Sequence, residues 1–522
     1  MKKTGFLSIA LFACLSCLHA QTKVFKEVSD EISSQIKIIK QDNALVGYLA
    51  FTRLEKASQD SFNYRITIMD ENLNDIGTVN FREEGLTLQD IAFEQDVLCL
   101  AYLKSNVIGN NYTKKEYNKV KDNTQNYVML QFLGLDGKII KTNSIKANIS
   151  ISSSYEGNSK LSATGSLKYP LQINNIPQKG FGCFYGDESN TSLSVYNLSG
   201  EQLWQKKVGQ DGQFFIMRTT ANDIYLLAKH KQEKQVEGGF ELLGYNANDG
   251  ASYDRLRLQD KQGNDLKVLA FDSDPTTGKL YLSGNIINQN RGDDIYTGRE
   301  FSRGPYTGIF TININGPKKV DLVQTYSYWG DGSQEESISK KGRFSDNNAY
   351  ALFSQSFKDY DGNTYFAGSA LIRKTRWGSI ASSVILAPLL VPPIAILGMG
   401  GTTKCKLTDV VLVKQNPKGI IYFDNTVSVD NSRFYKAMIP ISYYNGRSFY
   451  RVVNSDTKTN YLVIDDSKDI LIYNVNKRSV QRTIPHKDGQ IKTNVYPAKE
   501  GHVLVSEYNK KEKYTRFSIE VL

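Results

Sequence analysis

The residues of this sequence that could carry out chemistry are histidines and paired carboxylates, and the histidines are few. The chain has four histidines in 522 residues, and three lie beyond the N-terminal segment, at His230, His486 and His502. None has the His-Glu-x-x-His or Cys/His spacing that binds zinc. No Gly-x-Ser-x-Gly nucleophile motif and no phosphate-binding loop is present. The sequence therefore predicts no catalytic nucleophile, metal site or cofactor.

Carboxylates gather in segments that are typical of turns. These groups are Asp70-Glu71, Asp293-Asp294, Asp359 with Asp361, and Asp465-Asp466. Two carboxylates held across a pocket could hydrolyse a glycosidic bond, and Asp359-Tyr-Asp-Gly-Asn363 is the nearest approach to a calcium-binding loop. Because Asp and Asn also favour turns for conformational reasons, we interpret these groups as turn residues. Carbohydrate hydrolysis stays open as an alternative.

The elements that must position these residues are predicted to be short β-strands. Residues 63–81 form a strand, a polar turn and a second strand, because β-branched and aromatic residues flank an Asn/Asp cluster. Similar hairpins begin near residues 64, 127, 192, 241, 306, 409 and 469. The aromatic content of 11% also favours pleated sheets.

The spacing of these hairpins predicts the fold. Units of four short strands recur about every 50–65 residues, which is typical of β-propeller blades. We expect an all-β protein: one β-propeller domain over residues 21–522 with seven or eight four-stranded blades. Residues 22–28 form a spare strand and residues 494–522 supply only three, so the N-terminal strand should pair with the last blade and close the ring. Residues 147–166 are expected to form a surface loop between blades.

Residues 1–20 have the pattern of a secretory signal peptide. Two lysines precede an apolar stretch, 5–18, and a Leu-His-Ala cleavage site lies at 18–20. The alternative is a lipoprotein signal, in which the thiol of Cys14 or Cys17 would be acylated. Both interpretations predict export, to the periplasm, the outer-membrane surface or the extracellular medium.

The charge distribution and the cysteine content limit the classes of partner and the disulfide bonds that can be expected. The net charge is +10, but the lysine pairs are spread along the chain, which favours a soluble lysine-rich surface. Attraction to an anionic surface is the alternative, and export argues against a nucleic-acid partner. Only Cys99, Cys183 and Cys405 lie beyond the signal, too few for a disulfide framework. Cys99 and Cys183 occupy matching points of apolar strands and are predicted to be core residues, with a bridge between them as the alternative.

One insertion, 361–405, interrupts the sixth predicted blade. Its apolar segment 379–400 is uncharged and flanked by lysines and arginines. The segment is long enough to cross a bilayer, but Pro388, Pro392 and Pro393 oppose a continuous helix. We expect it to cover the propeller, to dip into a membrane surface, or to pack on a partner or a second copy. The candidate contact residues are Ile380, Val384, Ile385, Leu386, Leu389, Leu390, Val391, Ile394, Ile396, Leu397 and Met399.

The signal ending at Ala20-Gln21, the repeated hairpins and the apolar insertion together resemble the uncharacterised secreted β-propeller-like proteins of Bacteroidota. The resemblance covers nearly the whole mature chain and transfers no catalytic residue. We expect a non-enzymatic cell-envelope propeller that presents loops to a protein or glycan partner. The alternatives are an exported carbohydrate-active enzyme with carboxylates in the central channel, and a membrane-associated or self-associating protein anchored through 379–400.

Overall fold

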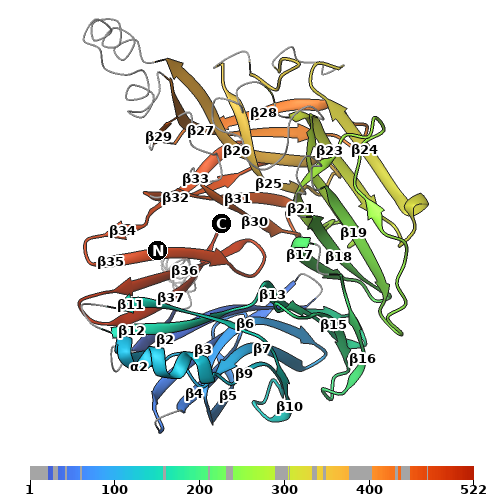
Figure 1. Cartoon of the computed structure of the whole chain (residues 1–522). Helices are drawn as coiled ribbons and strands as arrows, with labels where there is room; N and C mark the ends of the chain where they lie inside the picture. Colours follow the sequence, from blue (N-terminus) through green and yellow to red (C-terminus); the bar gives the residue numbers. More distant parts are fainter. Residues whose placement is uncertain are drawn as a thin grey trace, which may run out of the picture.

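The predicted all-β propeller fold is confirmed by a computed structural model, in which eight antiparallel sheets follow one another around a common centre (Figure 1). From the first blade to the seventh, the first strand of each sheet contacts the first strand of the next, and in the eighth sheet the contacting strand is the second, so these strands form the inner wall. The structure describes residues 22–26, 33–41, 44–58, 61–156, 160–209, 212–230, 239–288, 304, 306–331, 338–344, 348–375, 403–429, 433–436, 447–466 and 468–522.

The strands of each blade follow one another from the inner wall to the outer surface. The first contains β2 (Ser33–Gln41), β3 (Ala44–Lys56), β4 (Phe62–Asp70) and β5 (Asp75–Glu83). The second contains β6 (Gly85–Glu94), β7 (Val97–Ser105), β9 (Asn126–Gly134) and β10 (Ile139–Lys146). The third contains β13 (Tyr169–Ile176), β14 (Gly180–Gly186), β15 (Thr191–Tyr196) and β16 (Gln202–Lys207). The fourth contains β17 (Gly212–Thr219), β18 (Asp223–His230), β19 (Phe240–Asn246) and β20 (Leu256–Arg257).

The remaining four blades keep this order. The fifth contains β21 (Leu266–Ser273), β22 (Leu280–Ile287), β23 (Tyr306–Ile314) and, after the short helix η2 (Lys319–Asp321), β24 (Leu322–Tyr328). The sixth contains β25 (Tyr350–Lys358), β26 (Thr364–Thr375), β27 (Thr403–Gln415) and β28 (Ile421–Val427), with β29 (Arg433–Lys436) beside β27. The seventh contains β30 (Ser448–Asn454), β31 (Thr459–Asp465), β32 (Asp469–Asn474) and β33 (Ser479–Pro485). The eighth contains β34 (Lys487–Asp488), β35 (Ile491–Pro497), β36 (His502–Asn509), β37 (Tyr514–Val521) and β1 (Thr22–Lys26).

The core lies between blades, because side chains of a strand alternate between its two faces. In β3, Leu49 and Phe51 pack toward the second blade. Tyr48 and Ala50, on the other face, pack toward Leu504 of the last blade. Each blade therefore covers the apolar faces of its two neighbours, and the first and last blades share a core.

The predicted pairing of the N-terminal strand with the last blade is present. β1 runs antiparallel to β37, with Thr22 opposite Ser518 and Lys26 opposite Tyr514. The ring of Phe25 packs edge-on against Phe517, with centroids 5.6 Å apart. The first strand of the described chain thus forms the outer strand of the last sheet.

The prediction of a loop at 147–166 is wrong. β11 (Ser150–Glu156) and β12 (Lys160–Ser166) form a three-stranded sheet with β8 (Asn111–Tyr112), beside the second blade. These strands are rich in serine, which hid them in the sequence, but alternation still buries Leu161 and Ala163 on one face. The helix α2 (Lys114–Val120) and the short helix η1 (Lys121–Asn123) follow β8.

The predicted assignment of strands to positions in the sixth blade is also wrong. The first strand was expected to begin near residue 337, but in the described part of that stretch only an isolated bridge forms, between Ile338 and Phe344. Residues 349–357, which were expected to form the second strand, therefore correspond to the inner strand, β25. The second strand, β26, occupies part of the predicted insertion, so the link between β26 and β27 is 376–402 rather than 361–405. The surplus strand near Tyr435 is β29, which pairs with β27. Eight blades result.

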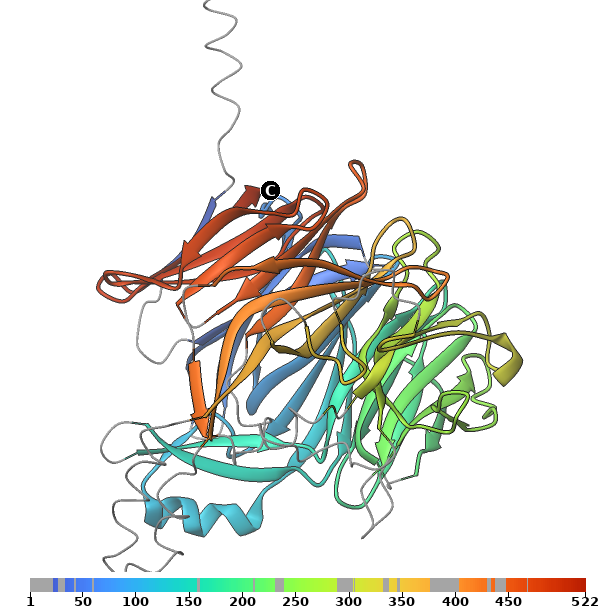
Figure 2. The ribbon, with the colours of Figure 1, turned by 90° about the horizontal axis from the view of Figure 1, so that it is seen from above.

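The two faces of the propeller differ. Because neighbouring strands within a blade are antiparallel, links between first and second strands and between third and fourth strands leave from one face, which we call the turn face. Links between second and third strands, and between blades, leave from the other, which we call the long-connection face. α2 and β29 belong to such links, and Figure 2 shows both at the lower edge of the molecule, with the C-terminus at the upper edge.

Candidate functional site

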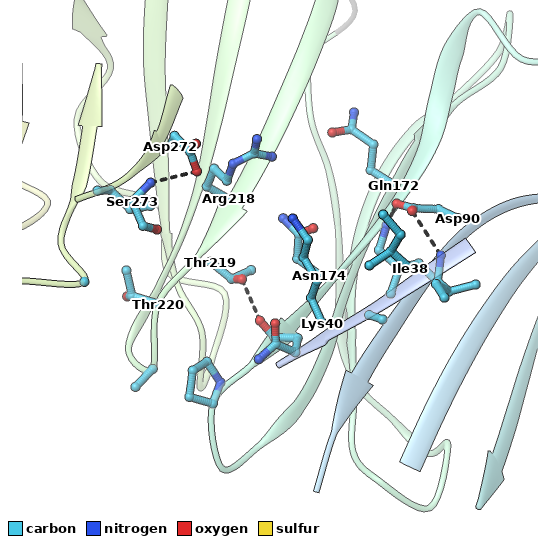
Figure 3. A pocket seen from close by; sticks show the side chains of 18 residues that line it. Ile38, Lys40, Asp90, Gln172, Asn174, Arg218, Thr219, Thr220, Asp272 and Ser273 are labelled. Carbon is cyan, nitrogen blue, oxygen red and sulfur yellow. Dashed lines mark hydrogen bonds between the residues drawn. The ribbon is translucent and has the colours of Figure 1, made fainter. Parts of the chain in front are cut away.

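A pocket of about 670 Å³ opens where the inner strands of the first five blades reach the turn face (Figure 3). Each of these blades contributes a polar side chain: Lys40, Asp90, Asn174, Arg218 and Asp272. Pockets of this size bind small molecules in many proteins. The pocket is the candidate site because it joins charged and amide groups from distant parts of the chain.

The inner strands that form this wall need hydrogen-bond partners for their backbone groups. An inner strand has an edge without a neighbouring strand, and its backbone groups need other hydrogen-bond partners. Side chains of adjacent blades supply them. Lys37 of β2 donates to the carbonyl oxygen of Gln89 in β6 at 2.8 Å. The amide of Ile173 in β13 donates to Oδ2 of Asp90 in β6 at 2.9 Å.

Hydrogen bonds between side chains of one blade and the backbone of the next also join the third, fourth and fifth blades. Gln172 of β13 donates from Nε2 to the oxygen of Phe215 at 2.8 Å and accepts from the amide of Met217 at 2.9 Å. Arg218 of β17 donates from Nε to the oxygen of Phe271 in β21 at 3.0 Å. Neighbouring inner strands are therefore fixed to one another, and the pocket wall is formed before any ligand binds.

The two carboxylates of the pocket have different surroundings. Both oxygens of Asp90 are engaged, one by the amide of Ile91 at 3.0 Å and the other by that of Ile173. Burial raises the pKa of Asp90, although these amides, Lys37 and Arg218 act in the opposite direction. Asp272 is exposed and accepts from the amide of Ser273 at 2.9 Å. Asp90 is thus held as a structural acceptor, whereas Asp272 is open to a ligand.

Amide and hydroxyl groups complete the lining. Asn174 donates from Nδ2 to the oxygen of Met217 at 2.8 Å, and Thr219 donates from Oγ1 to the oxygen of Asn175 at 2.6 Å. In Figure 3, Asn174 lies between Asp90 on one side and Asp272 on the other. Lys40 is exposed at the end of β2. The lining can therefore both donate and accept hydrogen bonds, as a polar ligand with several hydroxyl groups requires.

The interpretation of the carboxylate groups as turn residues is confirmed for Asp70-Glu71 and for Asp359 with Asp361, whereas Asp465 ends β31 and contacts His486. Oδ1 of Asp70 accepts from the amides of Asn72 and Asn74, both at 2.8 Å. Asp359 makes the same turn, accepting from the amide of Asn363 at 2.8 Å, and burial raises its pKa. Asp293-Asp294 lies outside the described residues.

The described side chains of His486, Cys99 and Cys183 contact a neighbouring blade or lie in the core. Nε2 of His486 lies 2.7 Å from Oδ1 of Asp465 in the seventh blade, and its Nδ1 lies 3.1 Å from the carbonyl oxygen of Thr493 in the eighth, so this side chain joins the two blades. Cys99 and Cys183 are buried free thiols in one core cluster, as predicted for core residues. Within the described ranges, no three His, Cys, Asp or Glu residues are grouped as a metal site would require. The side chain of His230 lies outside the description.

The apolar segment 379–400, and with it every candidate contact residue from Ile380 to Met399, lies outside the described residues. The structure does describe how the segment is attached, because Thr375 of β26 pairs with Thr403 of β27. The link therefore leaves and re-enters the blade at neighbouring points on the long-connection face. None of the helices in the described ranges has the length and apolar character needed to cross a membrane.

Comparisons with known proteins assign the chain to a family but add no chemistry. No curated protein matches the chain. The structure described as the Dos1 propeller shares 6% identity over 88% of each chain, with a TM-score of 0.39. The WD40 domain of SCAP from fission yeast shares 8% identity over 94% of this chain and 98% of that one, with a TM-score of 0.36. The model of a family of unknown function, DUF6770, matches residues 1–435, and the chain belongs to this family.

Proposed function

We propose that this protein is a non-enzymatic binding propeller of the cell envelope that holds part of a glycan in its turn-face pocket. The observation that supports the proposal most directly is the preformed pocket of about 670 Å³, to which five blades each contribute a polar side chain. The cell-envelope location rests on the signal-like pattern of residues 1–20.

The chemistry of the lining favours a neutral, hydroxyl-rich ligand. Lys40 and Arg218 are balanced by Asp90 and Asp272, so the lining carries no large excess of either charge. A sugar hydroxyl both donates and accepts, and amide, guanidinium and carboxylate groups match these roles. Because inter-blade hydrogen bonds already fix Asn174 and Arg218, little side-chain ordering would oppose binding.

The state of the carboxylates favours binding over hydrolysis. A glycosidase needs one carboxyl group to deliver a proton and another to act as base or nucleophile. Both oxygens of Asp90 accept backbone amides, so this carboxyl group is occupied in the wall. Asp272 remains as the one open carboxylate of the lining.

Glycan-array screening followed by calorimetry tests the proposal. Asp272→Ala and Lys40→Ala should each weaken binding of a selected oligosaccharide about tenfold or more, the loss of one or two hydrogen bonds to charged groups. Asp254→Ala is the matched control, because Asp254 is exposed on the outer part of the fourth blade, and it should bind like the parent. Unchanged affinity in both pocket variants would reject the proposal. Release of reducing sugar that Asp272→Ala abolishes would favour the enzyme instead.

A second candidate function is attachment to a membrane or a second copy through 379–400. It is favoured by the pairing of Thr375 with Thr403, since the link leaves and returns on one face. Flotation with liposomes and light scattering, with and without 379–400, test the two forms. Salt-resistant flotation or a dimer that the deletion abolishes would support it. A deletion variant that is folded and indistinguishable in both assays would exclude it.

A further inference from the structure

The helix α2 places a cluster of exposed lysines on the long-connection face. The helix lies in the link between β7 and β9. Lys114, Lys115 and Lys119 belong to it, and Lys121 follows at its C-terminal end. All four side chains are exposed. The sequence shows Lys114-Lys115 as an isolated pair, and the helical turn adds the other two.

The helix is held in a defined position. Thr113 caps its N-terminus, and Glu116 completes a capping box with the Thr113 backbone. Tyr117 and Val120 are its less exposed residues and mark the side that faces β8 and β12. The ring of Tyr117 packs against Tyr112 with centroids 6.3 Å apart. At 100° per residue, Lys115 and Lys119 therefore project away from the protein.

The positive charge of this cluster exceeds the negative charge beside it, because residues 114–122 contain four lysines but only two acidic residues, Glu116 and Asp122. None of the four lysines forms an ion pair with a described residue. Glu116 is the one acidic residue of α2, and its carboxylate accepts from the amide and the hydroxyl of Thr113 at 2.8 and 2.9 Å. Glu83 and Glu84, at the same face, pair with Lys104. An external anion would thus meet lysines that are not already paired.

We infer that α2 docks the long-connection face on an anionic phospholipid surface. Four flexible point charges on a convex, exposed helix match a diffuse layer of headgroup charge. A site for one phosphate group would instead be expected to offer a concave pocket and a guanidinium fork. The lysines are not interleaved with exposed aromatic residues, which single-stranded nucleic acid would use for stacking. The inference rests on α2 alone and is independent of the glycan proposal and of 379–400.

The test is co-sedimentation of the full chain with phosphatidylserine/phosphatidylcholine vesicles. A lysine near such a surface contributes about fivefold to the partition coefficient. The variant K114Q/K115Q/K119Q/K121Q, which keeps good helix formers, should lose about a hundredfold or more. The control K138Q/K319Q/K418Q/K477Q removes the same charge from exposed turn-face lysines and should bind like the parent. Binding of the parent should also fall with salt and be absent on pure phosphatidylcholine.

The circular dichroism spectrum and the thermal midpoint of both variants must equal those of the parent. A loss of binding then results from the changed surface charge and not from unfolding. Equal binding of the α2 variant and the parent would overturn the inference. Salt-resistant binding unchanged in the α2 variant would also overturn it and would favour 379–400. Salt-sensitive binding to acidic polysaccharide or nucleic acid, with none to vesicles, would assign the cluster to a different partner and reject the membrane.

Discussion

Replacing Lys358 by Met should destabilise the contact between the fifth and sixth blades. Lys358 lies at the end of β25 and is 5% exposed, and Asp274, its partner in the turn after β21, is 9% exposed. Nζ lies 2.9 Å from Oδ2 of Asp274, donates to Asn313, and lies 5.0 Å from the ring centre of Tyr281. One ammonium group thus holds three residues of the neighbouring blade.

The size of the effect follows from what the substitution leaves behind. Without Lys358, the carboxylate of Asp274 stays buried with the amides of Thr276 and Thr277, each at 3.0 Å. Removing one partner of a buried ion pair costs about 3–5 kcal/mol, and the two remaining amides place the expected loss near about 3 kcal/mol. The double variant K358M/D274N keeps an acceptor for the amides but removes the charge. It should recover about half of this loss.

The pH dependence gives a second, independent test. Burial opposes ionisation of Asp274, but the hydrogen bond from Lys358 and those from the amides outweigh it and lower the pKa. In the parent, the contribution of Asp274 is therefore present above its unfolded pKa of about 3.9 and is lost as pH falls through the lower folded pKa. In Lys358→Met, burial dominates and raises the folded pKa. The deficit of the variant should then shrink as pH falls from 7 to about 4.

Equilibrium urea unfolding, followed by tryptophan fluorescence at several pH values, measures these differences. A deficit below about 1 kcal/mol at pH 7 would show that the pair contributes no more than a surface ion pair. A double variant as unstable as Lys358→Met, or a deficit that grows as pH falls, would refute the assignment of the loss to an unpaired carboxylate.

Two further outcomes are expected elsewhere in the core. Tyr64→Phe should cost about 1–3 kcal/mol in urea unfolding, because the hydroxyl accepts from the amide of Leu86 at 2.8 Å and donates to the oxygen of Glu84 at 3.0 Å. An unchanged midpoint would contradict this. Burial raises the pKa of the thiols of Cys99 and Cys183, so neither should react with maleimide in the native protein up to pH 9, and both should react in guanidinium. Labelling of either before unfolding would show that the blades open locally.

The blades could be predicted because their strands alternate apolar and polar residues around Asn/Asp turns, as in 63–81. The errors fell where that signal is weak. β11 and β12 are too rich in serine to be recognised by hydrophobicity. The seven-residue α2 is too short for a helical period, although Thr113 and Glu116, at capping-box spacing, were a usable signal.

The pocket could not be predicted, because its residues come from five inner strands, one per blade. Asn174 and Arg218 are ordinary alternating polar residues within their strands. Only the packing of successive blades brings them to the same wall, and the hydrogen bonds that fix them go to backbone atoms, which the sequence does not distinguish. The carboxylate pairs that are visible in the sequence, such as Asp70-Glu71, lie in turns, as the sequence predicts.

The pairing of β1 with β37 has a consequence for how the chain is made. Residues 22–26 are synthesised before every other strand of the propeller, but their partner, 514–521, is synthesised after all of them. A nascent chain, or one cut at 435 where the family match ends, carries a β1 with no partner. Its Phe25 then has no Phe517 to pack against, which offers chaperones and proteases an apolar strand to recognise. β1 is thus covered only after the last blade has been synthesised.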